Sequence, residues 1–279
     1  MIKESDTKIR LGKIGYLNVL PIYYPLEKQV IKNSFEIIEG IPAQLNLLAS
    51  RGKLDISGTS SIEYARNFEK YLLIPNICIG SNGPVMSVLF LSKIPIKDLT
   101  GKKIVLTAHS HTSVTLLKIY LKSQNIEPEY IVGDVTKSIY NKDIYAALAI
   151  GDEALYLRGN TNFPYVMDLG EEWRKLTGLP FVFGVWVANK NSFDQLQDKI
   201  KYSCKLLLKA KEWGNQHLEM FAKIIEQKNI LSYNDALKYF KGLIYDMKDN
   251  YIKGLKLFYK FSYEYSLINR IPEINFIEL

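Results

Sequence analysis

One arrangement recurs along the chain: a short apolar strand, a turn of small polar residues or glycine, and then a helical pattern. Residues 11–21 are the first example, where an alternating apolar stretch leads through Asn18 to Pro21, a residue suited to the first turn of a helix. Four later segments repeat this order. At such junctions the strand's carboxyl end and the helix's free N–H groups face one crevice, where open α/β sheets bind ligands. The pattern therefore predicts a ligand cleft with Asn18 in its wall.

The first part of the chain alternates strands with helices. Ser60 and Glu63 have the spacing of a capping box, which places a helix start directly after a strand. The expected strands are residues 35–39, 54–57 and 71–79, and the expected helices are 43–50 and the segment that follows Ser60. This β-α-β-α-β order is typical of a mostly parallel sheet.

A second unit with its own alternation follows Pro95 and Gly101. Its expected strands are residues 103–107, 130–132, 146–150 and 165–168, and its expected helices are 113–123, 152–158 and 171–176. Two long apolar stretches, 85–92 and 181–188, would carry the chain out to this unit and back. We expect a two-lobed α/β fold of the periplasmic-binding-protein type (type II), which closes by a hinge around a small molecule. Lobe 1 would be residues 1–92 and 189–279, lobe 2 residues 93–188, and the ligand cleft would lie between them.

Beyond Asn191 the apolar spacing becomes helical. We expect helices over 193–227, with a break at Trp213 and Gly214, and over 234–267. Lys and Glu alternate around the apolar stripe, as on helices that cover a sheet and face solvent. This C-terminal helical section should therefore pack on the first lobe.

Charge and composition exclude several classes of partner. The net charge is +7, but Lys and Arg are spread along the 279 residues without a basic run or a stacking motif, so we expect no nucleic-acid binding. The excess positive charge would help to attract a small anionic substrate. The charged residues 1–8 lack the apolar core of a secretion signal, and no apolar stretch is long enough to cross a bilayer. We therefore expect a cytoplasmic protein without membrane contact, and a homodimer is compatible with this expectation.

Metal, triad and cofactor chemistry find little support. His109 and His111 flank Ser110 at a helix entrance without an acidic or cysteine partner at ligand spacing, so we interpret them as polar loop residues. His217 belongs to the C-terminal helices, and Cys78 and Cys204 fit buried free thiols. The sequence contains no Gly-x-Ser-x-Gly elbow, phosphate loop or dinucleotide fingerprint. We expect no metal and no cofactor.

The remaining candidates are small polar residues at strand ends. They are Asn18, Ser60, Ser61, Ser87, Thr107, Ser110, Thr112, Ser113, Gly151 and Asp152. Each by itself is typical of a helix cap or a turn. Together they indicate several helix N-termini around one crevice, where unpaired N–H donors and positive dipole ends suit carboxylates without arginine. We expect the cleft to bind an organic anion.

Several ungapped segments resemble chorismate dehydratase, which opens the futalosine route to menaquinone. The segments are residues 12–21, 54–57 with 60–65, 83–88, 106–107 with 110–114, 150–155, and 168–173 through 177–183. They cover about the first two thirds of the chain in order. The resemblance implies a cleft that removes water from chorismate, a dicarboxylate, to give 3-[(1-carboxyvinyl)oxy]benzoate.

Asn18 and Ser87 match the family's active-site asparagine and serine, so the resemblance assigns them the catalytic roles. The eight other candidates would bind substrate, with the hydroxyl-rich helix entrances holding its carboxylates. Loss of the ring C3 hydrogen and the C4 hydroxyl makes the ring aromatic, so the step needs orientation and exclusion of water more than a strong base. Met86 stands where the family usually has a small residue and would narrow the cleft.

Two other functions stay open at this point. One is the related enzyme that forms 1,4-dihydroxy-6-naphthoate later in the same pathway. The other is a non-enzymatic protein that binds organic anions, because a fold alone does not fix function.

Overall fold

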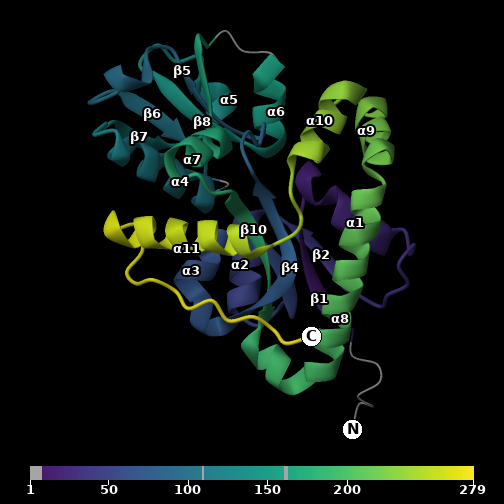
Figure 1. Cartoon of the computed structure of the whole chain (residues 1–279). Helices are drawn as coiled ribbons and strands as arrows, with labels where there is room; N and C mark the ends of the chain where they lie inside the picture. Colours follow the sequence, from purple (N-terminus) through teal and green to yellow (C-terminus); the bar gives the residue numbers. More distant parts are fainter. Residues whose placement is uncertain (1–7, 109, 160–162) are drawn as a thin grey trace.

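Two five-stranded sheets, each flanked by helices, form the body of the protein (Figure 1). The computed structural model describes residues 8–108, 110–159 and 163–279. The first sheet has the strand order β2-β1-β3-β10-β4 and the second has the order β7-β6-β8-β5-β9. The strands are β1 (Arg10–Ile14), β2 (Glu36–Gly40), β3 (Ile56–Ser60), β4 (Tyr71–Ser81), β5 (Val88–Ser92), β6 (Lys103–Leu106), β7 (Glu129–Val132), β8 (Ala146–Ile150), β9 (Tyr165–Asp168) and β10 (Phe181–Asn189).

Each sheet has one strand that runs against the others. In the first sheet β10 is antiparallel to both β3 and β4, and in the second β5 is antiparallel to both β8 and β9. The chain passes from the first sheet into the second at β5 and returns to the first sheet at β10. The mostly parallel sheets that the sequence predicts are therefore present. Because β5 pairs within the second sheet, we propose that the first crossing between lobes lies between Ser81 and Val88, earlier than the predicted boundary after residue 92.

Helices cover both sheets and begin at the predicted polar caps. The Ser60 and Ser110 hydroxyls accept hydrogen bonds from Glu63 N and Ser113 N, at 3.4 and 3.2 Å. The capping box is incomplete, because the Glu63 carboxylate accepts from Asn67 Nδ2. The α-helices of this part are α1 (Leu20–Glu27), α2 (Pro42–Ser50), α3 (Ser61–Asn67), α4 (His111–Ser123), α5 (Val135–Ser138), α6 (Gly151–Gly159) and α7 (Leu169–Thr177), and the 3-10 turns are η2 (Leu17–Val19), η3 (Phe68–Lys70) and η4 (Ile96–Asp98).

The C-terminal helices differ from the prediction in two places. They are α8 (Lys190–Gln216), α9 (Leu218–Gln227), α10 (Tyr233–Gly242) and α11 (Asp249–Glu264). The break comes at His217 and not at Gly214, which is helical. At Gly214, α8 lies so close to α1 that a Cβ would be 2.0 Å from the Pro21 carbonyl oxygen, so the packing requires glycine. The single helix expected over 234–267 is wrong: residues 243–248 are extended, and Ile244 forms a bridge with Gly80 of β4. Leu243, Tyr245 and Met247 are buried in alternation, a strand-like signal that the helical pattern around it obscured.

The core of the first sheet also supports the floor of the cleft. Trp186 of β10 is 1% exposed and donates from Nε1 to the Tyr23 hydroxyl, which donates in turn to the Gly12 carbonyl oxygen at 2.6 Å. Cys78 and Cys204 are buried free thiols, as predicted. None of the helices in the described part of the chain is long and apolar enough to cross a membrane.

Candidate functional site

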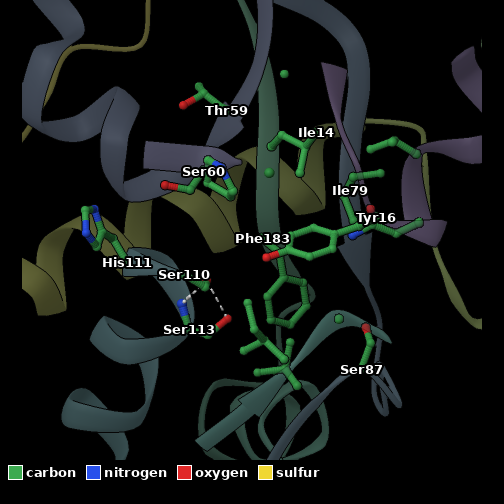
Figure 2. Close-up of a pocket in the computed structure, with 18 of the residues that line it drawn as sticks. Ile14, Tyr16, Thr59, Ser60, Ile79, Ser87, Ser110, His111, Ser113 and Phe183 are labelled. Atoms are coloured by element: carbon green, nitrogen blue, oxygen red, sulfur yellow. Dashed lines mark hydrogen bonds between the residues drawn. The ribbon is translucent and has the colours of Figure 1, made fainter. Parts of the chain in front are cut away.

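A pocket of about 950 Å³, part of it open to solvent, lies where the two sheets face each other. Figure 2 shows hydroxyl side chains around the rings of Tyr16 and Phe183. The lining includes Ile14, Tyr16, Asn18, Asn46, Thr59, Ser60, Ile79, Val85, Ser87, Ser110, His111, Ser113, Ile150, Gly151, Phe183 and Trp186. Six of the ten predicted site residues are in this set: Asn18, Ser60, Ser87, Ser110, Ser113 and Gly151.

Asn18 lies in the 3-10 turn η2 between β1 and α1. Its Oδ1 atom is buried and has no hydrogen-bond partner among the described residues. A buried amide oxygen without a partner is unfavourable, and an arriving ligand donor would satisfy it. The preceding residue is fixed from the other lobe, because Leu17 N donates to the Asp152 carboxylate at 3.3 Å. The turn that carries Asn18 therefore contacts both lobes.

Ser87 lies just before β5, at the end of the segment that leads into the second sheet, and is 3% exposed. Its hydroxyl has a long contact to the Val85 carbonyl oxygen at 3.5 Å and also interacts with the buried Tyr239 of α10. Its own carbonyl oxygen accepts from Gly151 N at 2.7 Å. Gly151 adopts a φ of +57°, and a Cβ there would meet the Tyr16 ring at 3.2 Å. Tyr16 thus packs across the cleft beside the backbone that holds Ser87.

Ser110 and Ser113 form a hydroxyl pair at the start of α4. Ser110 Oγ donates to Ser113 Oγ at 2.9 Å while it accepts from Ser113 N (Figure 2). Ser60, at the start of α3, presents a third hydroxyl to the pocket. These donors at helix N-termini suit a carboxylate.

The other four predicted site residues are absent from the pocket lining. The Ser61 hydroxyl lies 3.3 Å from that of Thr112 and donates to the Val182 carbonyl oxygen at 2.7 Å, and Thr112 Oγ1 accepts from Ile62 N. These bonds join the starts of α3 and α4, so we propose that Ser61 and Thr112 hold the two helix ends together. Thr107 is buried, and the Asp152 carboxylate accepts the hydrogen bond from Leu17 N described above.

Sequence reasoning missed several residues of the lining. Thr59 Oγ1 donates to Asn46 Oδ1 at 2.9 Å, so two further polar side chains meet at the pocket wall. Thr59 directly precedes the predicted Ser60, but Asn46 comes from the middle of α2, where no strand-end pattern points to it. Tyr16 and Phe183 supply the aromatic surface. Both belong to segments that the sequence predicts beside the cleft, Tyr16 to residues 11–21 and Phe183 to the strand 181–188.

The pocket contains little formal charge. Among the described lining residues there is no Lys, Arg, Asp or Glu. Partial desolvation and the nearby Arg66 lower the pKa of His111, which favours its neutral form. Burial and the Asp152 and Glu153 carboxylates raise the pKa of Tyr16 to about 12, and burial raises the pKa of Asp152. An anion here would be held by hydroxyl, amide and N–H dipoles.

Metal ligation has no geometric support in the part of the chain that the structure describes. Within residues 8–108, 110–159 and 163–279, no three His, Cys, Asp or Glu side chains gather closely enough to hold a metal ion. His111, expected in a loop, is the first residue of α4, and His109 lies outside the described residues.

Comparison with known proteins identifies the family. The family model described as menaquinone biosynthesis matches residues 9–264. The chain belongs to this menaquinone biosynthesis family. Chorismate dehydratase of Thermus thermophilus is 30% identical over 65% of this chain and 70% of that protein, and chorismate dehydratase of Campylobacter jejuni is 30% identical over 67% and 72%. A 1,4-dihydroxy-6-naphtoate synthase of Thermus thermophilus is 25% identical over 66% of each chain. The resemblance to a futalosine-pathway chorismate dehydratase that the sequence suggested is confirmed at the level of the family.

Solved structures confirm the predicted fold. Protein AF1704 of Archaeoglobus fulgidus superposes with a TM-score of 0.74 at 17% identity, over 94% of this chain and 98% of that one. The alkanesulfonate-binding protein SsuA of Xanthomonas axonopodis, solved with MOPS bound, superposes with a TM-score of 0.68 at 16% identity, over 96% of both chains. This member of the menaquinone biosynthesis family therefore has a periplasmic-binding-protein-like fold.

Proposed function

We propose that this protein is a chorismate dehydratase that acts in the cytoplasm. It removes water from chorismate to give 3-[(1-carboxyvinyl)oxy]benzoate. The observation that carries the proposal is the pair Asn18 and Ser87, which line one pocket from the turn after β1 and from the segment before β5, with no Lys or Arg among the described lining residues. Both residues match the family's active-site asparagine and serine. The relatives at 30% identity support the same activity.

The proposed step breaks two bonds and forms two. The C3–H bond breaks and its electron pair becomes the new C3–C4 double bond, while the C4–O bond breaks and the hydroxide takes up a proton to leave as water. The aromatic ring of the product supplies much of the driving force. Ser60, Ser110 and Ser113 would hold the two carboxylates, with Thr59 and Asn46 beside them, and the rings of Tyr16 and Phe183 would cover the cyclohexadiene ring and exclude water.

Asn18 and Ser87 would align the reacting atoms. The unpartnered Asn18 Oδ1 would accept a hydrogen bond from the C4 hydroxyl, and the Ser87 hydroxyl, which has a long contact to the Val85 carbonyl oxygen and interacts with Tyr239, would turn toward substrate. A neutral amide is a very weak base, so proton removal at C3 would be assisted by a substrate carboxylate. Catalysis would then come from preorganised dipoles and orientation.

The test is incubation of purified protein with chorismate, followed by ultraviolet absorbance and mass spectrometry for the loss of one water. We expect the carboxyvinyl-oxy-benzoate to form, and we expect Asn18→Asp and Ser87→Ala each to lower kcat at least about tenfold. Ser203→Ala, a buried serine of α8 outside the pocket lining, is the control. Full turnover in both site variants would refute the assignment of Asn18 and Ser87.

The relative at 25% identity raises a second candidate, formation of 1,4-dihydroxy-6-naphthoate. If the protein leaves chorismate unchanged, a thermal-shift measurement distinguishes the remaining functions, because a ligand that binds the folded state raises the melting temperature. Stabilisation by chorismate without turnover would indicate an organic-anion binding protein. No stabilisation would direct the search to the naphthoate-forming reaction.

A further inference from the structure

Asp168, at the end of β9, binds two separate pieces of backbone with one carboxylate. Its Oδ1 atom accepts from Gly170 N at 2.9 Å and Glu171 N at 3.2 Å, which caps the start of α7. Its Oδ2 atom accepts from Met86 N at 2.7 Å, and Val85 N lies 3.0 Å from both oxygens. The side chain is 9% exposed. A helix cap needs only one oxygen, so the second is available for the crossing segment that leads to Ser87.

The backbone bound by this second oxygen has an unfavourable conformation. Met86 has a φ of +64°, a region that side chains other than glycine rarely adopt. Such conformations persist where the surrounding structure enforces them. Here the N–H groups of Val85 and Met86 are both fixed on Asp168. The carboxylate therefore stabilises the turn at Met86.

A second contact joins the same two segments. At Gly170, the second residue of α7, an added Cβ would lie 2.6 Å from the Gly83 carbonyl oxygen and 2.7 Å from Ser81 Oγ. Ser81 Oγ donates to that Gly83 carbonyl at 2.9 Å. The start of α7 is therefore packed directly on the crossing segment, and glycine is required for the approach.

We propose that Asp168 is a positioning residue, which holds the strained turn at Met86 and thereby places the Ser87 hydroxyl in the pocket. This inference rests on the proposed dehydratase function. Asp168 is absent from the described pocket lining, so it acts through the backbone and does not touch substrate. The Ser87 hydroxyl has a 3.5 Å contact to the Val85 carbonyl oxygen and interacts with the buried Tyr239, and the backbone that Asp168 holds sets the position from which the Ser87 side chain extends. Residues 85–87 thus form a loop that carries the proposed catalytic Ser87, and the hydrogen bonds to Asp168 are the clamp that holds this loop.

Two substitutions distinguish the hydrogen bonds that Asp168 accepts from Val85 N and Met86 N from its capping of α7. Asp168→Asn keeps one oxygen for the start of α7 and places an NH2 group against the N–H groups of the crossing segment. Asp168→Ser keeps a good cap and removes the second oxygen without that repulsion. Asp134→Asn is the matched control, because Asp134 caps α5 through Lys137 N at 3.1 Å in the same lobe.

The experiment measures chorismate turnover and amide hydrogen exchange on the full chain. For Asp168→Asn and Asp168→Ser we expect kcat to fall about tenfold or more with KM changed less than about threefold, and exchange to quicken in the peptide that contains residues 85–87. Adding Met86→Gly to Asp168→Asn should raise kcat at least about threefold, because glycine adopts a positive φ without strain. Asp134→Asn should leave kcat and this peptide unchanged.

Three other outcomes would each refute either the positioning role of Asp168 or the proposed dehydratase function. Unchanged kcat in both Asp168 variants, with an active wild type, would overturn the positioning role and leave the dehydratase intact. A wild type that does not dehydrate chorismate would refute the proposed function, and the exchange of residues 85–87 would then decide the clamp. If neither variant folds, Asp168 is a determinant of folding and the positioning role is wrong.

Discussion

Substitution of Gly151 by alanine tests the contact between the lobes at the cleft. Gly151 has a φ of +57°, and its new methyl group would lie 3.2 and 3.3 Å from two ring carbons of Tyr16. The backbone strain costs about 1 kcal/mol, after the gain from a less flexible unfolded chain, and lowers Tm by about 2–4 °C. The crowded contact pushes the Tyr16 ring and with it the turn that carries Asn18. About 1.4 kcal/mol of overpacking there lowers kcat/KM for chorismate about tenfold.

Gly178→Ala distinguishes the cost of backbone strain from the crowding against Tyr16. Gly178 ends α7 with a φ of +71°, and its Cβ would meet nothing within 4 Å. We expect the same loss of Tm, measured by circular dichroism, and a kcat/KM within about twofold of wild type. If Gly178→Ala lowers kcat/KM as much as Gly151→Ala does, or if Gly151→Ala leaves it unchanged, the argument that Tyr16 is held against Gly151 is wrong.

Three further predictions concern stability and are measured by urea denaturation. Gly214→Ala should destabilise the fold by about 3 kcal/mol or more, because its Cβ would lie 2.0 Å from the Pro21 carbonyl oxygen; a loss below about 1 kcal/mol would contradict the close packing of α8 on α1. Tyr71→Phe should be neutral or stabilising by about 1 kcal/mol, because the buried Tyr71 hydroxyl has no partner among the described residues, and a clear loss would reveal one. Burial opposes ionisation of Asp55, but hydrogen bonds from Arg10 and Ser192 outweigh it and lower its pKa below the ordinary 3.8. Its contribution to the free energy of unfolding is therefore present above about pH 4 and is lost as the pH falls through the lowered pKa. We expect Asp55→Asn to be about 1–3 kcal/mol less stable than wild type at pH 7, and this difference should narrow between about pH 5 and 3. A difference that does not change with pH would refute the argument that ionised Asp55 stabilises the fold.

The sequence by itself determined the strands, most helices and the cap positions, because these depend on neighbours a few residues apart. Ser60 caps α3 as predicted, whereas α4 begins at His111, two residues before the predicted start, with Ser110 as its cap; the alternation of strands and helices indicated the two-sheet architecture. Residues 243–248 escaped prediction because their partner, Gly80, is far away in the chain.

Which strand-end residues face the pocket was decided only by the tertiary structure. Ser60 lines the pocket while its neighbour Ser61 points to Thr112 and the Val182 carbonyl, since successive side chains at the end of a strand point in different directions. Asn46 comes from a helix without any local signal, and Asp168 reaches Met86 across 82 residues of sequence. Contacts of this kind follow from how two separately formed sheets are joined, and a local pattern carries no information about that arrangement.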